Sequence, residues 1–114
     1  MIYNRTEIRK EVRSVLEHWF TEGVEYATVK EHPMGGNILL TIDNTNENKY
    51  DLYDSLVLVC KKIDGKWQTV WEKCLCNYFK NFWEQITEDW LCDLINDMTD
   101  AVMLHIEEPK KRGF

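Results

Sequence analysis

The stretch from Thr87 to Glu108 constrains the fold most, because it has the clearest helical pattern in the chain. Thr87 is a suitable N-cap, acidic residues follow it in the first turn, and Pro109 ends the pattern. One side of a helix over 88–106 gathers the residues that recur every three or four positions, which are Leu91, Leu94, Ile95, Met98, Val102, His105 and Ile106. A helix of this kind has to bury that side, so the rest of the chain must supply a core.

The opposite side of this predicted helix carries four aspartates. Asp89, Asp93, Asp97 and Asp100 follow one another at spacings of four, four and three residues. Like charges four residues apart destabilise a helix by about a few tenths of a kcal/mol per pair. From position 84 to position 108 the chain has eight acidic residues and no lysine or arginine. Helix stability does not explain this pattern, so we predict that the four aspartates bind a protein partner with a basic surface.

The preceding part of the chain indicates a second long helix and four strands. Asn4 and Glu7 form a capping-box pattern, and an apolar stripe follows them in a helix over 4–23. The predicted strands cover 24–31, 38–42, 56–63 and a fourth segment that ends near Glu72. Consecutive strands with helices at both ends of the chain favour an α+β fold with an antiparallel four-stranded sheet. We expect the order α-β-β-β-β-α-α, with the N-terminal helix and one or two C-terminal helices packed on one face.

Asp64 and Gly65 give the strongest hairpin signal in the chain. A two-residue turn there pairs Ile63 with Lys66 and, farther along, Val59 with Val70 and Leu58 with Trp71. This register predicts a core face made of Leu56, Leu58, Cys60, Trp67 and Trp71, which adds to Ile38, Leu40 and Ile42 of the strand before it.

Residues 70–83 fit both strand and helical spacing, and we interpret them as the end of a strand followed by a short helix over 75–83. Seven aromatic residues lie between Trp67 and Trp90. One interpretation places them in the core. The other places some of them on an exposed groove or dimer face, because Trp and Tyr favour interfaces. The second interpretation predicts a contiguous apolar patch of Tyr78, Phe79, Phe82 and Trp83, and it adds Tyr78, Phe82 and Trp83 to the candidate partner-binding residues.

Length and composition indicate one compact domain. A chain of 114 residues with 44% hydrophobic residues supports a modest core, which we assign to residues 1–109, with a short basic tail over 110–114. No apolar run approaches the roughly 20 residues of a membrane span, and charged residues interrupt the N-terminus. We therefore expect a cytoplasmic protein without membrane contact, whose four cysteines are reduced thiols.

The sequence carries no recognisable catalytic or metal-binding motif. Cys74 and Cys76 do not have the usual two-residue spacing of a zinc knuckle, and carboxylates along one straight helix diverge too much to surround a calcium ion. Exposed carboxylates also lack the perturbed pKa that acid–base catalysis requires. We predict no metal site, no cofactor and no enzymatic activity.

Two functional hypotheses follow from the charge pattern. The net charge of −6 and the acidic helix oppose direct binding of nucleic acid. The first hypothesis is a small acidic protein-binding module, an inhibitor that occupies a basic or nucleic-acid-binding surface of its partner. Phage counter-defence proteins and immunity proteins are often of this type, so a phage origin is suggested by analogy only. The alternative is a structural or self-associating domain, such as a homodimer formed through an aromatic surface, whose acidic helix is only solvated or pairs with Arg5, Arg9 and Arg13.

Overall fold

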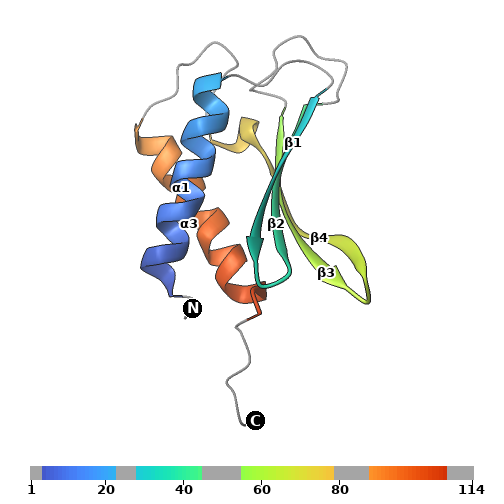
Figure 1. Ribbon diagram of the computed structural model, residues 1–114. Helices are drawn as coiled ribbons and strands as arrows, with labels where there is room; N and C mark the ends of the chain where they lie inside the picture. Colours follow the sequence, from blue (N-terminus) through green and yellow to red (C-terminus); the bar gives the residue numbers. More distant parts are fainter. Residues whose placement is uncertain (1–3, 23–27, 45–54, 79–87, 108–114) are drawn as a thin grey trace.

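The protein folds as two long helices against one antiparallel sheet (Figure 1). This computed structural model describes residues 4–22, 28–44, 55–78 and 88–107. Its elements, in chain order, are α1 (Arg5–Glu22), β1 (Thr28–Gly35), β2 (Ile38–Asn44), β3 (Leu56–Ile63), β4 (Lys66–Cys74), the 3₁₀ helix η1 (Leu75–Asn77) and α3 (Glu88–His105).

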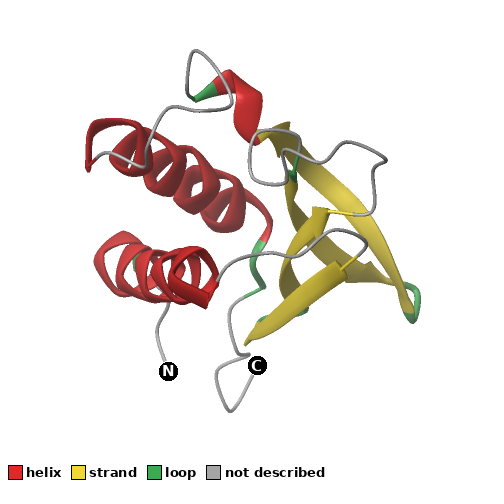
Figure 2. Cartoon of the chain, turned by 90° about the horizontal axis from the view of Figure 1, so that it is seen from above, coloured by secondary structure: helices red, strands yellow, loops and turns green. Residues whose placement is uncertain are grey.

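The sheet has the simple strand order β1-β2-β3-β4, in which every neighbouring pair is antiparallel. Figure 2 shows α1 and α3 on the same side of this sheet. The predicted α+β class, with an N-terminal helix, four strands in one sheet and a C-terminal helix, is confirmed. The predicted short helix over 75–83 begins as η1, but residues 79–83 and the basic tail lie outside the described residues.

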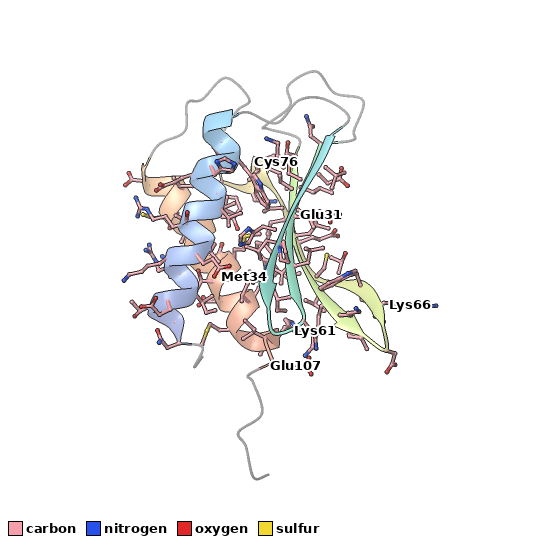
Figure 3. The ribbon with its side chains drawn as sticks, in the orientation of Figure 1. Glu31, Met34, Lys61, Lys66, Cys76 and Glu107 are labelled. Atoms are coloured by element: carbon pink, nitrogen blue, oxygen red, sulfur yellow. The ribbon has the colours of Figure 1, made fainter. Side chains whose placement is uncertain are left out.

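The core lies between the two helices and the inner face of the sheet. The apolar stripes predicted for both helices are buried, and Met34 points from β1 toward α1 (Figure 3). The buried cluster consists of Ile8, Val12, Val15, Leu16 and Trp19 of α1, Met34, Ile38, Leu40, Ile42, Val57 and Val59 of the sheet, Leu75, and Leu91, Leu94, Ile95, Met98, Ala101 and Val102 of α3. Because α3 contributes more residues than any other single element, it is the centre of this core.

The β3–β4 hairpin has the predicted turn but not the predicted register. Asp64 and Gly65 both have positive φ values, 52° and 80°, as a two-residue hairpin turn requires, and Ile63 pairs with Lys66. Farther from the turn the register shifts, so that Val59 pairs with Trp71 and Val70 is the extra residue of a β-bulge. The predicted pairings of Val59 with Val70 and of Leu58 with Trp71 are therefore wrong by one residue.

The core face predicted for β3 is also wrong. Val57 and Val59 are completely buried in the core, so the alternating Leu56, Leu58 and Cys60 face the other side of the sheet. Pairing with β2 decides this, since Val59 lies opposite the buried Leu40. The same register turns Trp67 outward, with 47% of its surface exposed, whereas the bulge leaves Trp71 packed against the core as predicted.

The first strand ends later than predicted. β1 continues through Pro33 to Gly35, with a register shift between them, and positions 24–27 of the predicted strand lie outside the described residues. Proline is tolerated here because β1 is an edge strand, where a missing backbone donor breaks no ladder. The predicted cap of α1 is present, since the backbone N–H of Glu7 donates to Oδ1 of Asn4 at 3.0 Å. The N-cap predicted for the last helix, Thr87, lies outside the described residues.

The β1–β2 turn contacts the C-terminal end of α3. Gly36 and Asn37 have φ values of 59° and 61°, and the backbone N–H of Glu107 donates to the carbonyl oxygen of Gly36 at 3.0 Å. Asn37 also donates through its amide to the carboxylate of Glu107. This contact holds the end of the helix against the sheet.

We expect Leu94→Ala to lower the free energy of unfolding by about 2–5 kcal/mol, because Leu94 is completely buried at the centre of the core. Leu104→Ala is the matched control on the same helix, since 78% of Leu104 is exposed. Denaturant unfolding of both variants measures the difference. A loss below about half a kcal/mol for Leu94→Ala would contradict the described core.

Two glycine variants test the turn contact. Gly65→Ala should destabilise the protein by about 1–2 kcal/mol through its positive φ alone, because no atom lies within 4 Å of the added Cβ. In Gly36→Ala the added Cβ meets Cγ1 of Ile106 at 2.5 Å and the carbonyl oxygen of Glu107 at 2.7 Å. This steric overlap should destabilise Gly36→Ala by roughly 1–3 kcal/mol in addition to the effect of the positive φ. Equal melting temperatures for the two variants would show that the turn does not pack on α3.

Candidate functional site

The four predicted aspartates form a continuous row on the exposed side of α3. Asp89, Asp93, Asp97 and Asp100 are all solvent-exposed, and the buried residues of α3 lie on its opposite side. At 1.5 Å of rise per residue the row extends about 16 Å along the helix axis. We call these four residues the acidic ridge.

The C-terminal half of the acidic ridge is held by two contacts within the protein. Nη2 of Arg5 lies 2.8 Å from Oδ1 of Asp100, and the hydroxyl of Tyr78 donates to Oδ2 of Asp97 at 2.8 Å. In the described part of the chain no cationic side chain forms an ion pair with Asp89 or Asp93. The N-terminal half of the ridge therefore presents two carboxylates to solvent.

The arginines of α1 neutralise the ridge at only one position. Arg5 pairs with Asp100, as one of the two hypotheses predicted. Arg9 instead donates through Nε to Oδ1 of Asn96 at 2.9 Å, and Nε of Arg13 lies 2.6 Å from Oε1 of Glu17 on its own helix. Within the described ranges, internal ion pairing thus accounts for one of the four aspartates.

Tyr78, which follows β4 and η1 in the chain, contacts the acidic ridge. Its ring packs against the core, and its hydroxyl reaches Asp97. Burial, followed by the hydrogen bond to Asp97 and the negative charges of Asp97 and Asp93, raises the pKa of Tyr78 above its ordinary value. The raised pKa extends the pH range in which the hydroxyl is protonated and can donate to the Asp97 carboxylate.

A groove lies between α3 and β4 beside the C-terminal half of the ridge. Its volume is about 390 Å³, and it is lined by Trp71, Lys73, Asp97, Asp100, Ala101 and Leu104. The small side chain of Ala101 leaves room between the helix and the strand, and Leu104 is 78% exposed at the rim. An exposed leucine next to two fixed carboxylates gives this surface both apolar and acidic character.

The sequence interpretation missed Leu104 and the groove. Leu104 follows Asp100 by four residues, so helical spacing alone places it on the acidic side. The exposed position of Leu104 could therefore have been predicted from the sequence. The place of Trp71 in the groove lining could not, because it depends on the bulge at Val70.

The predicted aromatic surface is described only at Tyr78. This residue lies beside Asp97, so the structure brings one member of the aromatic group to the acidic ridge. Phe79, Phe82 and Trp83 lie outside the described residues. The participation of Tyr78, Phe82 and Trp83 in partner binding stays a prediction.

Over the described ranges, no three His, Cys, Asp or Glu side chains come together in a way that could hold a metal ion. Cys60, Cys74, Cys76 and Cys92, all within the described ranges, form no disulfide. Within the same ranges, neither long helix is apolar enough over its length to cross a membrane.

Comparison with protein-family models, with curated proteins and with solved structures finds no match to this chain. The arguments for function therefore depend on the geometry and charge of this molecule.

Tyr78→Phe tests the contact between Tyr78 and the ridge. Loss of the hydrogen bond should lower the free energy of unfolding by about 0.5–1.5 kcal/mol at neutral pH. Because the pKa of Tyr78 is raised in the folded protein, the folded state keeps its proton where an unfolded tyrosine loses it, above roughly pH 10. Wild-type stability should therefore fall as pH rises above that value, and the variant should fall less. Identical pH slopes in denaturant unfolding would contradict the assignment.

Proposed function

We propose that this protein is a small acidic protein-binding module that recognises a basic surface of its partner through the acidic ridge. The observation that carries the proposal is the exposure of Asp89 and Asp93, which have no cationic partner among the described residues. These carboxylates sit on a rigid helix whose other side is fixed in the core. The partner would supply the positive charges that the described residues of this chain do not place there.

The groove beside Leu104 supports the same function. Protein interfaces usually combine a central apolar anchor with a charged or polar rim. Here Leu104, Ala101 and Trp71 offer apolar contact, and Asp97 and Asp100 stand at its edge. Carboxylates held by Tyr78 and Arg5 lose little conformational entropy on binding, because their positions are already restricted.

The negative charge of the acidic ridge favours one such function most, the inhibition of a nucleic-acid-binding protein. Arginine and lysine side chains that bind phosphate also bind carboxylates, so an acidic helix can occupy the same surface. Such an inhibitor would act in the cytoplasm. Phage counter-defence proteins and immunity proteins are often small acidic domains, and the analogy with them extends no further than that.

Self-association through the aromatic residues near Tyr78 has weaker support. The ring of Tyr78 packs on the core and its hydroxyl is engaged by Asp97, so this residue offers little free aromatic surface.

The experiment is affinity capture from host lysate, followed by binding measurements with the captured protein. Asp89→Lys/Asp93→Lys should weaken binding by at least about tenfold at low salt, and wild-type binding should itself weaken as salt rises. Glu31→Lys/Glu72→Lys is the matched control, because it makes the same change in charge at two exposed positions of the sheet.

Unchanged affinity in a folded Asp89→Lys/Asp93→Lys variant would exclude the ridge as the binding surface. An equal loss in the Glu31→Lys/Glu72→Lys control would show that only net charge matters. Circular dichroism and melting temperature establish that each variant is folded.

A further inference from the structure

The far end of the β3–β4 hairpin carries charge opposite to that of the acidic ridge. Lys61 and Lys62 lie just before the last residue of β3, and Lys66 begins β4. Asp64 of the turn is the one acidic residue between these lysines. Lys62 and Lys66 are exposed, and Lys66 projects outward from the end of the hairpin (Figure 3). A protein with a net charge of −6 thus has a local basic surface.

An exposed tryptophan lies among these lysines. Trp67 is 47% exposed and pairs directly with Lys62 across the hairpin. Nζ of Lys62 lies 6.0 Å from the centroid of the Trp67 ring, at the limit of a cation–π contact. We call Lys62, Lys66 and Trp67 the basic hairpin.

The basic hairpin and the acidic ridge complement each other in two ways. Their charges are opposite, and each contains a large exposed apolar side chain, Trp67 in the hairpin and Leu104 beside the ridge. In the described part of the chain only Val29 is a further large hydrophobic residue with comparable exposure, and it lies in neither surface.

The two surfaces cannot meet within one molecule. Trp67 and Lys62 occupy positions on the face of the sheet opposite to Val57 and Val59, whereas α3 packs against the face that carries these valines. Lys61 and Lys62 line a pocket with His105 and Glu107 at the C-terminal end of the α3 segment, and the acidic ridge lies farther toward the N-terminus of that helix. Figure 1 shows the hairpin extending away from the helices. Contact between the basic hairpin and the acidic ridge therefore requires two copies of the chain.

We infer that the basic hairpin of one copy docks on the acidic ridge of a second copy. Lys62 and Lys66 then pair with carboxylates of the ridge. This inference rests on the proposed function, because it uses the ridge as a binding surface and names one occupant of it. Since the contact joins two different surfaces, it either closes reciprocally into a dimer or continues to larger assemblies. Self-association also competes with any other basic partner for the same ridge.

Charge-swapped variants of the full chain test this contact by sedimentation velocity. Lys62→Glu/Lys66→Glu reverses the hairpin and Asp89→Lys/Asp93→Lys reverses part of the ridge. Each variant alone should associate at least about tenfold more weakly than wild type, because its two surfaces then carry like charges. An equimolar mixture of the two should associate again, since every hairpin–ridge contact between unlike copies joins opposite charges. Trp67→Ala should also weaken association, whereas Val29→Ala, at the other exposed site, should not.

A wild-type protein that stays monomeric at low salt and high concentration would overturn the inference, as would a mixture of the two variants that stays monomeric. These outcomes are separate from the test of the proposed function. If Asp89→Lys/Asp93→Lys loses a captured partner but the mixture does not associate, the ridge binds other proteins and not its own hairpin. If the mixture associates but the captured partner is unaffected, the ridge serves self-association.

Discussion

The fold depends on burying the apolar side of α3 against two partners at once. Leu94, Ile95 and Met98 are completely buried between α1 and the sheet, so the core cannot close unless both pack on this helix. At about 25 cal/mol per Å² of apolar surface, such side chains supply much of the stability of a small domain. The side-chain contacts between α1 and α3, such as Arg9 with Asn96, adjust a geometry that the buried residues already determine.

This burial fixes which residues α3 presents to solvent. Once the apolar side faces the core, the aspartates and Leu104 must face outward, because helical spacing places them on the other side. Among the described residues, Arg5 forms an ion pair with Asp100, and the neutral hydroxyl of Tyr78 donates a hydrogen bond to Asp97. The unneutralised part is the physical basis for the proposed binding surface. The basic hairpin lies at the opposite face of the sheet, away from this row of aspartates.

The sequence was sufficient where a pattern was local and insufficient where two strands had to be aligned. Helical spacing predicted the buried sides of both helices, and Asp64-Gly65 predicted the hairpin turn. The run Leu56-Val57-Leu58-Val59 is apolar at every position, so alternation could not select its inner face. Pairing with β2 makes that choice, and it joins residues about twenty positions apart.

In the candidate site, too, the local features could be predicted from the sequence and the tertiary contacts could not. The row of aspartates could be read from spacing alone, and Leu104 could have been added to it. The hydrogen bond from Tyr78 to Asp97 and the groove between α3 and β4 could not, because both depend on how β4 and η1 are placed by tertiary packing. The bulge at Val70 is a further case, since no residue in the hairpin marks it.

The central claim is that the open aspartates of α3 serve binding and not the fold. Denaturant unfolding of Asp93→Asn at low salt tests it most directly, because Asp93 lies one turn from both Asp89 and Asp97 and no described cationic side chain pairs with it. Removing its charge relieves repulsion on both sides, so the account predicts a free energy of unfolding that is unchanged or higher by about a few tenths of a kcal/mol. A decrease of more than about 1 kcal/mol would show that Asp93 stabilises the folded chain, and it would contradict the claim.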